Sequence, residues 1–454
     1  MDDNNLLLRN CNLLTPDAPV KRGVDIEIEN GAISNISSRG HSNGRVLDCD
    51  GKYVIPGFVN AHAHCYQNLM RGLGADMQFR DWLTKAKYVV CEIANESDVY
   101  ISTLIAHLEM MKSGITTVID NFDFHNDSGG LHAISDACGE SGIRTAVARG
   151  MRVRTSIASE WDVPAFVIPN NEERELRLTE DAIRTFDATL NGRLRVFISP
   201  TALYYSSTEL LLGAKTLSEK YHTCIHMHVG EGRDSQSASL KLFGKREVEL
   251  LDELGILNSR FQAVHATNLT EREIEMLAER NCTVVHNPVS NMYLATGICP
   301  LVELLKADVK IALGTDGAGS NDSYNFFETM KITSLLQKSA SGNPAAISAR
   351  RIFDMATLGG AGTLADERIG QVKPGYRADL VVLDLKKPSS LPDYRPVHNL
   401  IYACNPSNVV HVIVDGVPTI LDGKHARLNE DELITLFMKS TERIAERVAG
   451  TITA

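Results

Sequence analysis

Short apolar runs recur through the middle of the chain, from about residue 57 to about residue 365, and longer stretches separate them. Asp98–Ser113 carries apolar side chains at helical spacing, and Thr270–Arg280 begins with a Thr-x-x-Glu capping pattern. Such an alternation of strands and helices over about 300 residues predicts a (β/α)8 barrel. The eight strand candidates are Phe58–His62, Thr116–Ile119, Thr145–Arg149, Val196–Ser199, Cys224–His228, Gln262–His265, Thr283–His286 and Lys310–Asp316.

Both ends of the chain have a different sequence pattern, in which short apolar strands are joined by tight turns. Leu6–Leu8 and Val24–Ile28 are strand candidates near the start, and Arg377–Asp384 and Val409–Gly416 are strand candidates near the end. Two β-rich ends around a long middle predict one small domain built from both. We therefore expect a composite β-sandwich domain from residues 1–56 and 366–454, including a C-terminal helix, and a barrel from residues 57–365.

Composition and charge narrow the classes of partner. The net charge of −11 argues against binding to a nucleic-acid backbone, which relies on clustered Lys and Arg. The first residues lack the pattern of a secretory signal, and no apolar run approaches the ~18 residues that span a bilayer. The nine cysteines are scattered without a Cys-x-x-Cys pair, which favours free thiols in a reducing compartment. We expect a cytoplasmic protein with neither nucleic-acid nor membrane partners.

Ligating and charged residues fall at the predicted carboxyl ends of the barrel strands, where (β/α)8 barrels build their active sites. Several such placements in one predicted barrel are hard to reconcile with chance. They are His62 and His64 after the first strand, Asp120 after the second, His228 and Glu231 after the fifth, His265 after the sixth, His286 after the seventh and Asp316 after the eighth.

The pattern His62-Ala63-His64 predicts a metal site. Residues i and i+2 of an extended strand project to the same face, so both imidazoles can face one ion. Imidazole nitrogen suits Zn2+ or Fe2+, and His228 supplies a third nitrogen from another strand. His226 lies two residues earlier on the same strand face, and we expect it to be a packed, hydrogen-bonded histidine rather than a ligand.

Three further strand-end residues predict acid–base chemistry. Asp316 follows a buried strand, where a carboxylate is costly unless it is paired or metal-bound, so it is the natural fourth ligand. Glu231 lies three residues after His228, where it can take a proton from a metal-bound water. His265 is a candidate for polarising the substrate ring.

For other polar residues near strand ends, structural and functional roles stay equally open. These residues are Asp120, Asn121, Asp123, His125 and His286.

These residues, in this order, resemble the amidohydrolase superfamily, in its branch of metal-dependent deaminases and s-triazine hydrolases. The resemblance runs from about residue 5 to residue 425 and implies a barrel with a composite β-sandwich. By position it implies His62, His64, His228 and Asp316 as ligands of the metal, with Glu231 as proton shuttle and His265 as polarising group. The segments that carry it are Pro56–His64, Ser113–Thr117, His228–Glu231, Pro288–Asn291, Gly314–Gly317 and Gly375–Leu380.

The resemblance also implies a cofactor and a substrate-binding set. Residues 196–201 hold no Lys where binuclear members carry a carbamylated one, which supports one divalent metal ion per subunit, Zn2+ or alternatively Fe2+. Gln67 corresponds to a residue that reads a ring nitrogen or carbonyl, and Trp82 is placed to stack on a flat ring or to pack as a helix start. The expected substrate-binding residues are Gln67, Trp82, Asn291 and Ser320.

The expected activity is hydrolytic deamination of an amino-substituted nitrogen heteroaromatic ring of purine, pterin or triazine type, with release of ammonia. An alternative keeps the site and displaces chloride, alkylamine or methylthio from a triazine-like ring. Triazine hydrolases carry a polar side chain where Gly317 stands here, which argues against a triazine substrate. A third and remote hypothesis is that the chain is a non-catalytic assembly protein with the same fold. The resemblance also implies a homodimer or a larger homo-oligomer, as is usual in this family.

Overall fold

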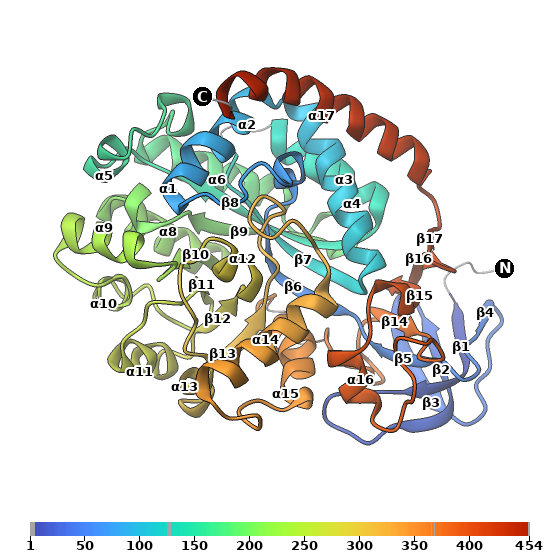
Figure 1. The fold of residues 1–454 in the computed structure, drawn as a ribbon. Coiled ribbons are helices and arrows are strands. Elements are labelled where there is room, and N and C mark those ends of the chain that lie inside the picture. The colour runs from blue at the N-terminus through green and yellow to red at the C-terminus, as the bar shows by residue number, and fades with distance from the viewer. Residues whose placement is uncertain (1–4, 125–128, 365, 367, 453–454) are drawn as a thin grey trace.

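The computed structural model describes residues 5–124, 129–364, 366 and 368–452, and Figure 1 shows a central set of strands surrounded by helices, with a second sheet at one edge of the molecule. His125 lies outside the described residues. One sheet has eight strands and belongs to the middle of the chain, and the other has nine and belongs to both ends.

The eight-stranded sheet follows chain order from β6 to β13, and neighbouring strands in it are parallel. Such strands are covered on both faces, which explains why they appear as continuous apolar runs; every residue of β7 is buried. All eight predicted strands are confirmed, and so is the (β/α)8 fold class. The strands are β6 (Phe58–Ala63), β7 (Ile115–Phe122), β8 (Arg144–Met151), β9 (Leu194–Pro200), β10 (Ile225–Val229), β11 (Phe261–His265), β12 (Thr283–His286) and β13 (Lys310–Leu313).

The last strand of the barrel meets the first at the residues that carry the candidate site. Just beyond β13, the N–H groups of Thr315 and Asp316 donate to the carbonyl oxygen of His62 in β6, at 3.1 and 3.0 Å. Asp316 and His62 are therefore neighbours through the backbone as well as through their side chains.

Helices surround the barrel, and capping side chains fix several of their first turns. Helix α11 begins with a capping box between Thr270 and Glu273, as the sequence predicts, and Asn95 caps α3 in the same way. The helices before β10 are α1 (Phe79–Asp81), α2 (Tyr88–Ile93), α3 (Glu96–Lys112), α4 (Gly129–Ser141), α5 (Ser156–Glu160), α6 (Glu172–Phe186), α7 (Thr189–Gly192) and α8 (Thr208–Tyr221). Those after β10 are α9 (Arg233–Phe243), α10 (Glu247–Glu253), α11 (Glu271–Glu279), α12 (Pro288–Tyr293), α13 (Leu301–Lys306), α14 (Phe326–Ser341), α15 (Ala349–Asp354), α16 (Pro396–Tyr402) and α17 (Glu430–Ile452).

The nine-stranded sheet joins the two ends of the chain. Its central contact is antiparallel, with Ile55 of β5 opposite Val381 of β14. Helix α17 leaves this sheet and lies across α2 and α3 (Figure 1). The exact domain boundaries at residues 56/57 and 365/366 stay a prediction. The strands are β1 (Leu6–Leu13), β2 (Lys21–Glu29), β3 (Ala32–Ser37), β4 (Arg45–Asp48), β5 (Tyr53–Pro56), β14 (Leu380–Leu383), β15 (Val409–Val414), β16 (Val417–Leu421) and β17 (Lys424–His425).

None of the helices in the described part of the chain combines the length and the apolarity that crossing a bilayer requires.

Candidate metal centre

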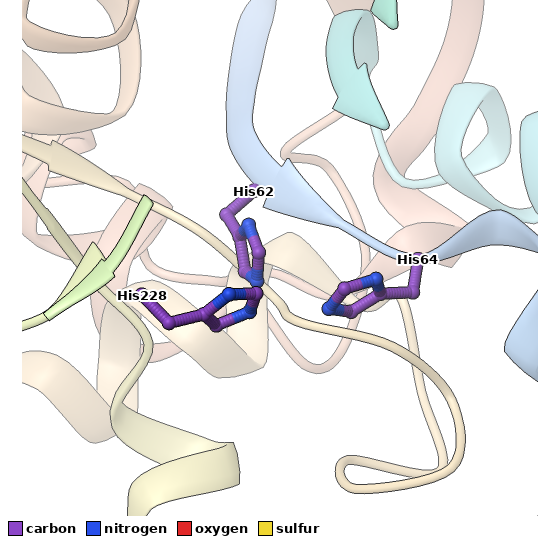
Figure 2. Close-up of side chains that lie close together, drawn as sticks. All are labelled: His62, His64 and His228. Atoms are coloured by element: carbon purple, nitrogen blue, oxygen red, sulfur yellow. The ribbon is translucent and has the colours of Figure 1, made fainter. Parts of the chain in front are cut away.

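Three histidines meet at the carboxyl ends of the barrel strands. His62 lies in β6, His64 directly follows that strand, and His228 lies in β10. One ring nitrogen from each lies within 4.8 Å of the others, and Figure 2 shows the three rings converging. Their exposed fractions are 0%, 3% and 7%, so the cluster is shielded from solvent.

Asp316 completes this cluster with an oxygen. Its Oδ1 lies 3.5 Å from His62 Nε2 and 3.5 Å from His64 Nε2. Burial opposes ionisation of this carboxyl, but the imidazoles of His62, His265 and His64 outweigh burial and hold the pKa of Asp316 well below its usual range. The site therefore offers three imidazole nitrogens and a carboxylate.

Hydrogen bonds on the far side of two rings set which nitrogen is available. His64 Nδ1 lies 2.6 Å from the carbonyl oxygen of Asn121, and His228 Nδ1 lies 2.7 Å from that of Thr201. Because a carbonyl oxygen only accepts, Nδ1 carries the hydrogen in both rings and leaves the Nε2 lone pair for an ion.

His62 gives the direct test of whether a metal fits. Its Nδ1 faces His226 Nε2 at 2.8 Å, whereas its buried Nε2 makes no hydrogen bond to any described residue. Burial lowers the pKa of His62 to about 4 and that of His228 well below its usual value, so both rings are neutral, as metal ligation requires. The donor set of nitrogen and oxygen fits one divalent Zn2+ or Fe2+.

Glu231 and His265 lie beside the cluster. Glu231 Oε1 is 3.7 Å from His265 Nε2, which is itself 3.9 Å from Asp316 Oδ2. Burial raises the pKa of Glu231, with His265 opposing the shift and Asp316 adding to it. A buried carboxyl group with a raised pKa is suited to both accepting and donating a proton during a reaction.

The backbone at two of these residues is strained. His265 and Asp316 have φ angles of 78° and 64°, a region that non-glycine residues rarely adopt. Such strain persists where the surroundings fix it, and it is typical of functional sites. The barrel therefore holds both side chains in directions that an unstrained strand end would not give.

His226 and Asp120, two further polar residues near the strand ends, have clear structural contacts. His226 is packed and hydrogen-bonded, as expected, with Nδ1 2.7 Å from Gln262 Oε1. Asp120 Oδ1 accepts from the backbone N–H of Cys65 at 2.9 Å, just after the second histidine of the metal cluster. His286 is fully buried, and neither ring nitrogen makes a hydrogen bond to a described residue.

Asp123 anchors a network that sequence reasoning missed. Its carboxylate accepts from Lys87 Nζ at 2.6 Å and from the Tyr66 hydroxyl at 2.7 Å, and it lies 3.4 Å from His64 Nδ1. Burial opposes ionisation, but Lys87, His64 and Arg152 hold the pKa of Asp123 well below its usual range. No local pattern links Lys87 to Asp123, because Lys87 lies in the helical segment Trp82–Lys87 after β6 and Asp123 directly follows β7.

The predicted substrate-binding residues separate into two groups. Trp82 and Ser320 line a small cavity beside the metal cluster, and Trp82 Nε1 donates to the carbonyl oxygen of Gly319 at 2.6 Å. Asn291 instead contacts His265, with Oδ1 2.8 Å from Nδ1. Gln67 packs behind the cavity wall, so its role in reading a ring stays a prediction.

Two adjoining cavities open at this end of the barrel. The inner one has a volume of about 20 Å3 and touches His64, His228 and Asp316. The outer one has a volume of about 360 Å3, and Phe79, Glu231 and Leu294 line both. The inner space suits a water molecule and the outer one a small ligand, with Glu231 between them.

A (β/α)8 barrel with imidazole and carboxylate ligands at its strand ends defines a metal-dependent hydrolase class. The chain belongs to the amidohydrolase family, whose model matches residues 53–419. This confirms the expected membership.

Curated relatives share nearly the full length of the chain. It is 32% identical over 447 residues to a 5'-deoxyadenosine deaminase of Methanosarcina mazei, covering 98% of this chain and 99% of the relative. It is 34% identical over 420 residues to a 5-methylthioadenosine/S-adenosylhomocysteine deaminase of Thermococcus sibiricus, covering 92% and 94%. The relatives are named as deaminases, in line with the activity expected from the sequence.

Solved structures have the same fold. An adenosine deaminase from Xanthomonas campestris with bound zinc has a TM-score of 0.89 at 27% identity, covering 97% of this chain and 98% of that one. An atrazine chlorohydrolase from Arthrobacter aurescens complexed with zinc has a TM-score of 0.89 at 23% identity, covering 97% and 100%. The second likeness concerns the fold alone.

Proposed function

We propose that the protein is a mononuclear, metal-dependent hydrolase that removes an exocyclic amino group from a purine-type ring, with an adenosine derivative as the favoured substrate class. The observation that carries this proposal is the place of Glu231, which lies between the inner cavity at the metal cluster and the larger outer cavity. The names of the curated relatives support the adenosine derivative.

The residues present divide the work of such a reaction. A bound Zn2+ or Fe2+ lowers the pKa of water at the site. The Glu231 carboxylate takes the proton of the attacking water and delivers it to the ring nitrogen and then to the leaving amine. His265 stabilises the charge that develops at the carbon under attack, and Asp316 orients the attacking water. Asn291 holds the ring of His265 through its 2.8 Å contact.

Glu231→Gln tests the assignment of the proton carrier. The amide keeps the shape of the side chain but cannot take up a proton, so we expect retained metal content and at least a ~100-fold loss of kcat. Glu275→Gln on the exposed face of α11 is the matched control and should keep full activity. A fully active E231Q protein with normal metal content would remove Glu231 from the mechanism.

A screen of ammonia and chloride release distinguishes the substrate classes. The purified protein is incubated separately with 5'-deoxyadenosine, adenosine, an amino-substituted pterin, melamine and atrazine. The ammonia and chloride released from each compound are quantified. We expect ammonia from the adenosine derivatives. Chloride release from atrazine without ammonia release from any purine would favour the triazine alternative instead.

The metal identity, the cytoplasmic location and the homodimer or larger assembly belong to the same proposal. The zinc in the Xanthomonas campestris adenosine deaminase supports Zn2+ over Fe2+. Elemental analysis of the purified protein tests the first point, and light scattering coupled to size exclusion tests the assembly.

A further inference from the structure

Another cavity, separate from the inner and outer cavities, lies at the opposite end of the barrel from the metal centre. Its volume is about 430 Å3, within the range of small-molecule sites. Gly142 lies just before β8, and Asn191 and Arg193 lie just before β9, so this wall comes from the amino ends of the strands. The other wall is the nine-stranded sheet, with Asn30 and the turn at Asp415 between β15 and β16.

The charged residues that line this cavity are mainly positive, although the chain as a whole is negatively charged. The protein carries a net charge of −11, yet the charged lining residues are three arginines, Arg193, Arg377 and Arg427, and one acid, Asp415. Asp415 Oδ1 lies 2.8 Å from Arg377 Nη1 and 3.2 Å from Nη2 of the neighbouring Arg144, and these two arginines also pair with Asp366 and Asp379. The cavity therefore has an excess of positive charge.

Arg193 and Arg427 carry that excess. Among the described residues, neither has a carboxylate within 4.0 Å, and the hydrogen bonds that their side chains donate go to backbone carbonyl oxygens. Arg193 Nη1 donates to Gly142 at 2.9 Å, and Arg427 Nη2 donates to Glu140 at 3.1 Å. Each guanidinium has five N–H donors, so most of them remain for a ligand.

The two guanidinium groups converge on one point. A Cβ added at Gly142 would lie 2.8 Å from Arg427 Nη2 and 3.6 Å from Arg193 Nη1. Like charges held this close favour an anion between them, and planar guanidinium groups match the oxygens of a phosphoryl group. Burial lowers the pKa of Arg193; Asp415 opposes this shift, and Arg144 and Arg427 add to it.

We propose that this cavity binds the phosphoryl group of a small phosphorylated molecule, held between Arg193 and Arg427 where the barrel meets the nine-stranded sheet. A ligand there touches both parts of the chain and stabilises their contact. The site is independent of the proposed deamination, because none of its lining residues lies at the metal centre.

The test measures binding to the intact protein by calorimetry and thermal unfolding. Pyrophosphate and ATP are titrated at an ionic strength held constant with KCl. We expect saturable binding, with a rise in Tm of about 3 °C at a hundredfold excess over Kd. Binding of both probes indicates a site for phosphate itself, and binding of ATP alone indicates that the organic body is recognised as well.

Variants place the ligand. Arg427→Gln changes an exposed residue and should weaken binding about tenfold, since it removes a charge-assisted contact. Arg193→Gln should weaken it likewise, and Arg272→Gln on α11 is the matched control with unchanged binding. The proposal is overturned if KCl alone reproduces the Tm rise, if both variants bind normally, or if an adenosine derivative displaces the anion from the metal centre.

Discussion

Gly317 is the residue whose replacement gives the sharpest test of how the site is packed. A Cβ added there would lie 2.1 Å from Gln67 Oε1 and 2.5 Å from its Cδ, far inside van der Waals contact. Gln67 is 0% exposed, so it has no solvent into which to move. We expect Gly317→Ala to cost about 2 kcal/mol, a typical penalty for overpacking. With ~2.1 cal/mol/K of unfolding entropy per residue, 454 residues give about 1 kcal/mol/K and a Tm lower by about 2 °C.

The rescue of this variant separates a specific clash from general damage. Gln67→Ala removes the atoms that Cβ would meet, so the double variant should have the same Tm as Gln67→Ala alone. Gly139→Ala in α4 is the control, because a Cβ added there would lie 3.7 Å from the nearest atom, Leu190 Cδ2, at ordinary van der Waals contact. The Tm of this variant should stay the same or rise. Scanning calorimetry measures all four. If the shifts of G317A and Q67A simply add, Gln67 is not what excludes a side chain at position 317.

Three further results are expected. Dialysis against a chelator should abolish deaminase activity, and Zn2+ or Fe2+ should restore it; activity in protein shown by elemental analysis to be metal-free would contradict the assigned ligands. Asn291→Ala should lower kcat about tenfold with little change in KM, because it frees the ring of His265 held at 2.8 Å. Burial raises the pKa of Glu247 to about 8, so between pH 4.5 and 8 the folded state keeps a proton that the unfolded state loses, and stability falls as pH rises. The Tm of Glu247→Gln should therefore exceed that of the wild type by a margin that grows over this pH range and then levels off, whereas a constant margin would contradict the raised pKa.

The barrel was predictable because its strands are buried on both faces and therefore stand out as apolar runs. The residue after such a run faces the catalytic end by geometry alone, which is why His228, His265 and Asp316 could be placed without knowing any contact. The pairing of Ile55 with Val381 joins residues more than 300 positions apart. The sequence predicted that the two ends meet, but no local pattern specifies that register.

The groups that support the candidate site were harder to find for a physical reason. Asp123 contacts Lys87 and Tyr66 only because the segments after β6 and β7 approach each other at the barrel mouth, and no periodic pattern in the sequence specifies that approach. Gln67 is a different case. Its position after the second histidine predicted contact with a ring, whereas Gly317 leaves room for it inside the wall.

The two ends of the barrel differ in how their charges are compensated, and this difference bears on what each end binds. At the carboxyl end, the imidazoles of His62, His64 and His228 face the carboxylate of Asp316, an arrangement that favours a cation. At the amino end, Asp415 pairs with Arg377 and Arg144, which also pair with Asp366 and Asp379, whereas Arg193 and Arg427 have no carboxylate within 4.0 Å among the described residues, an arrangement that favours an anion. Both follow from the same topology, in which strand ends gather residues that are remote in sequence. Only the residues at the carboxyl end could be predicted from the sequence, because they directly follow apolar runs. The arginines at the amino end come from separate turns of the barrel and of the nine-stranded sheet, so no sequence pattern links them.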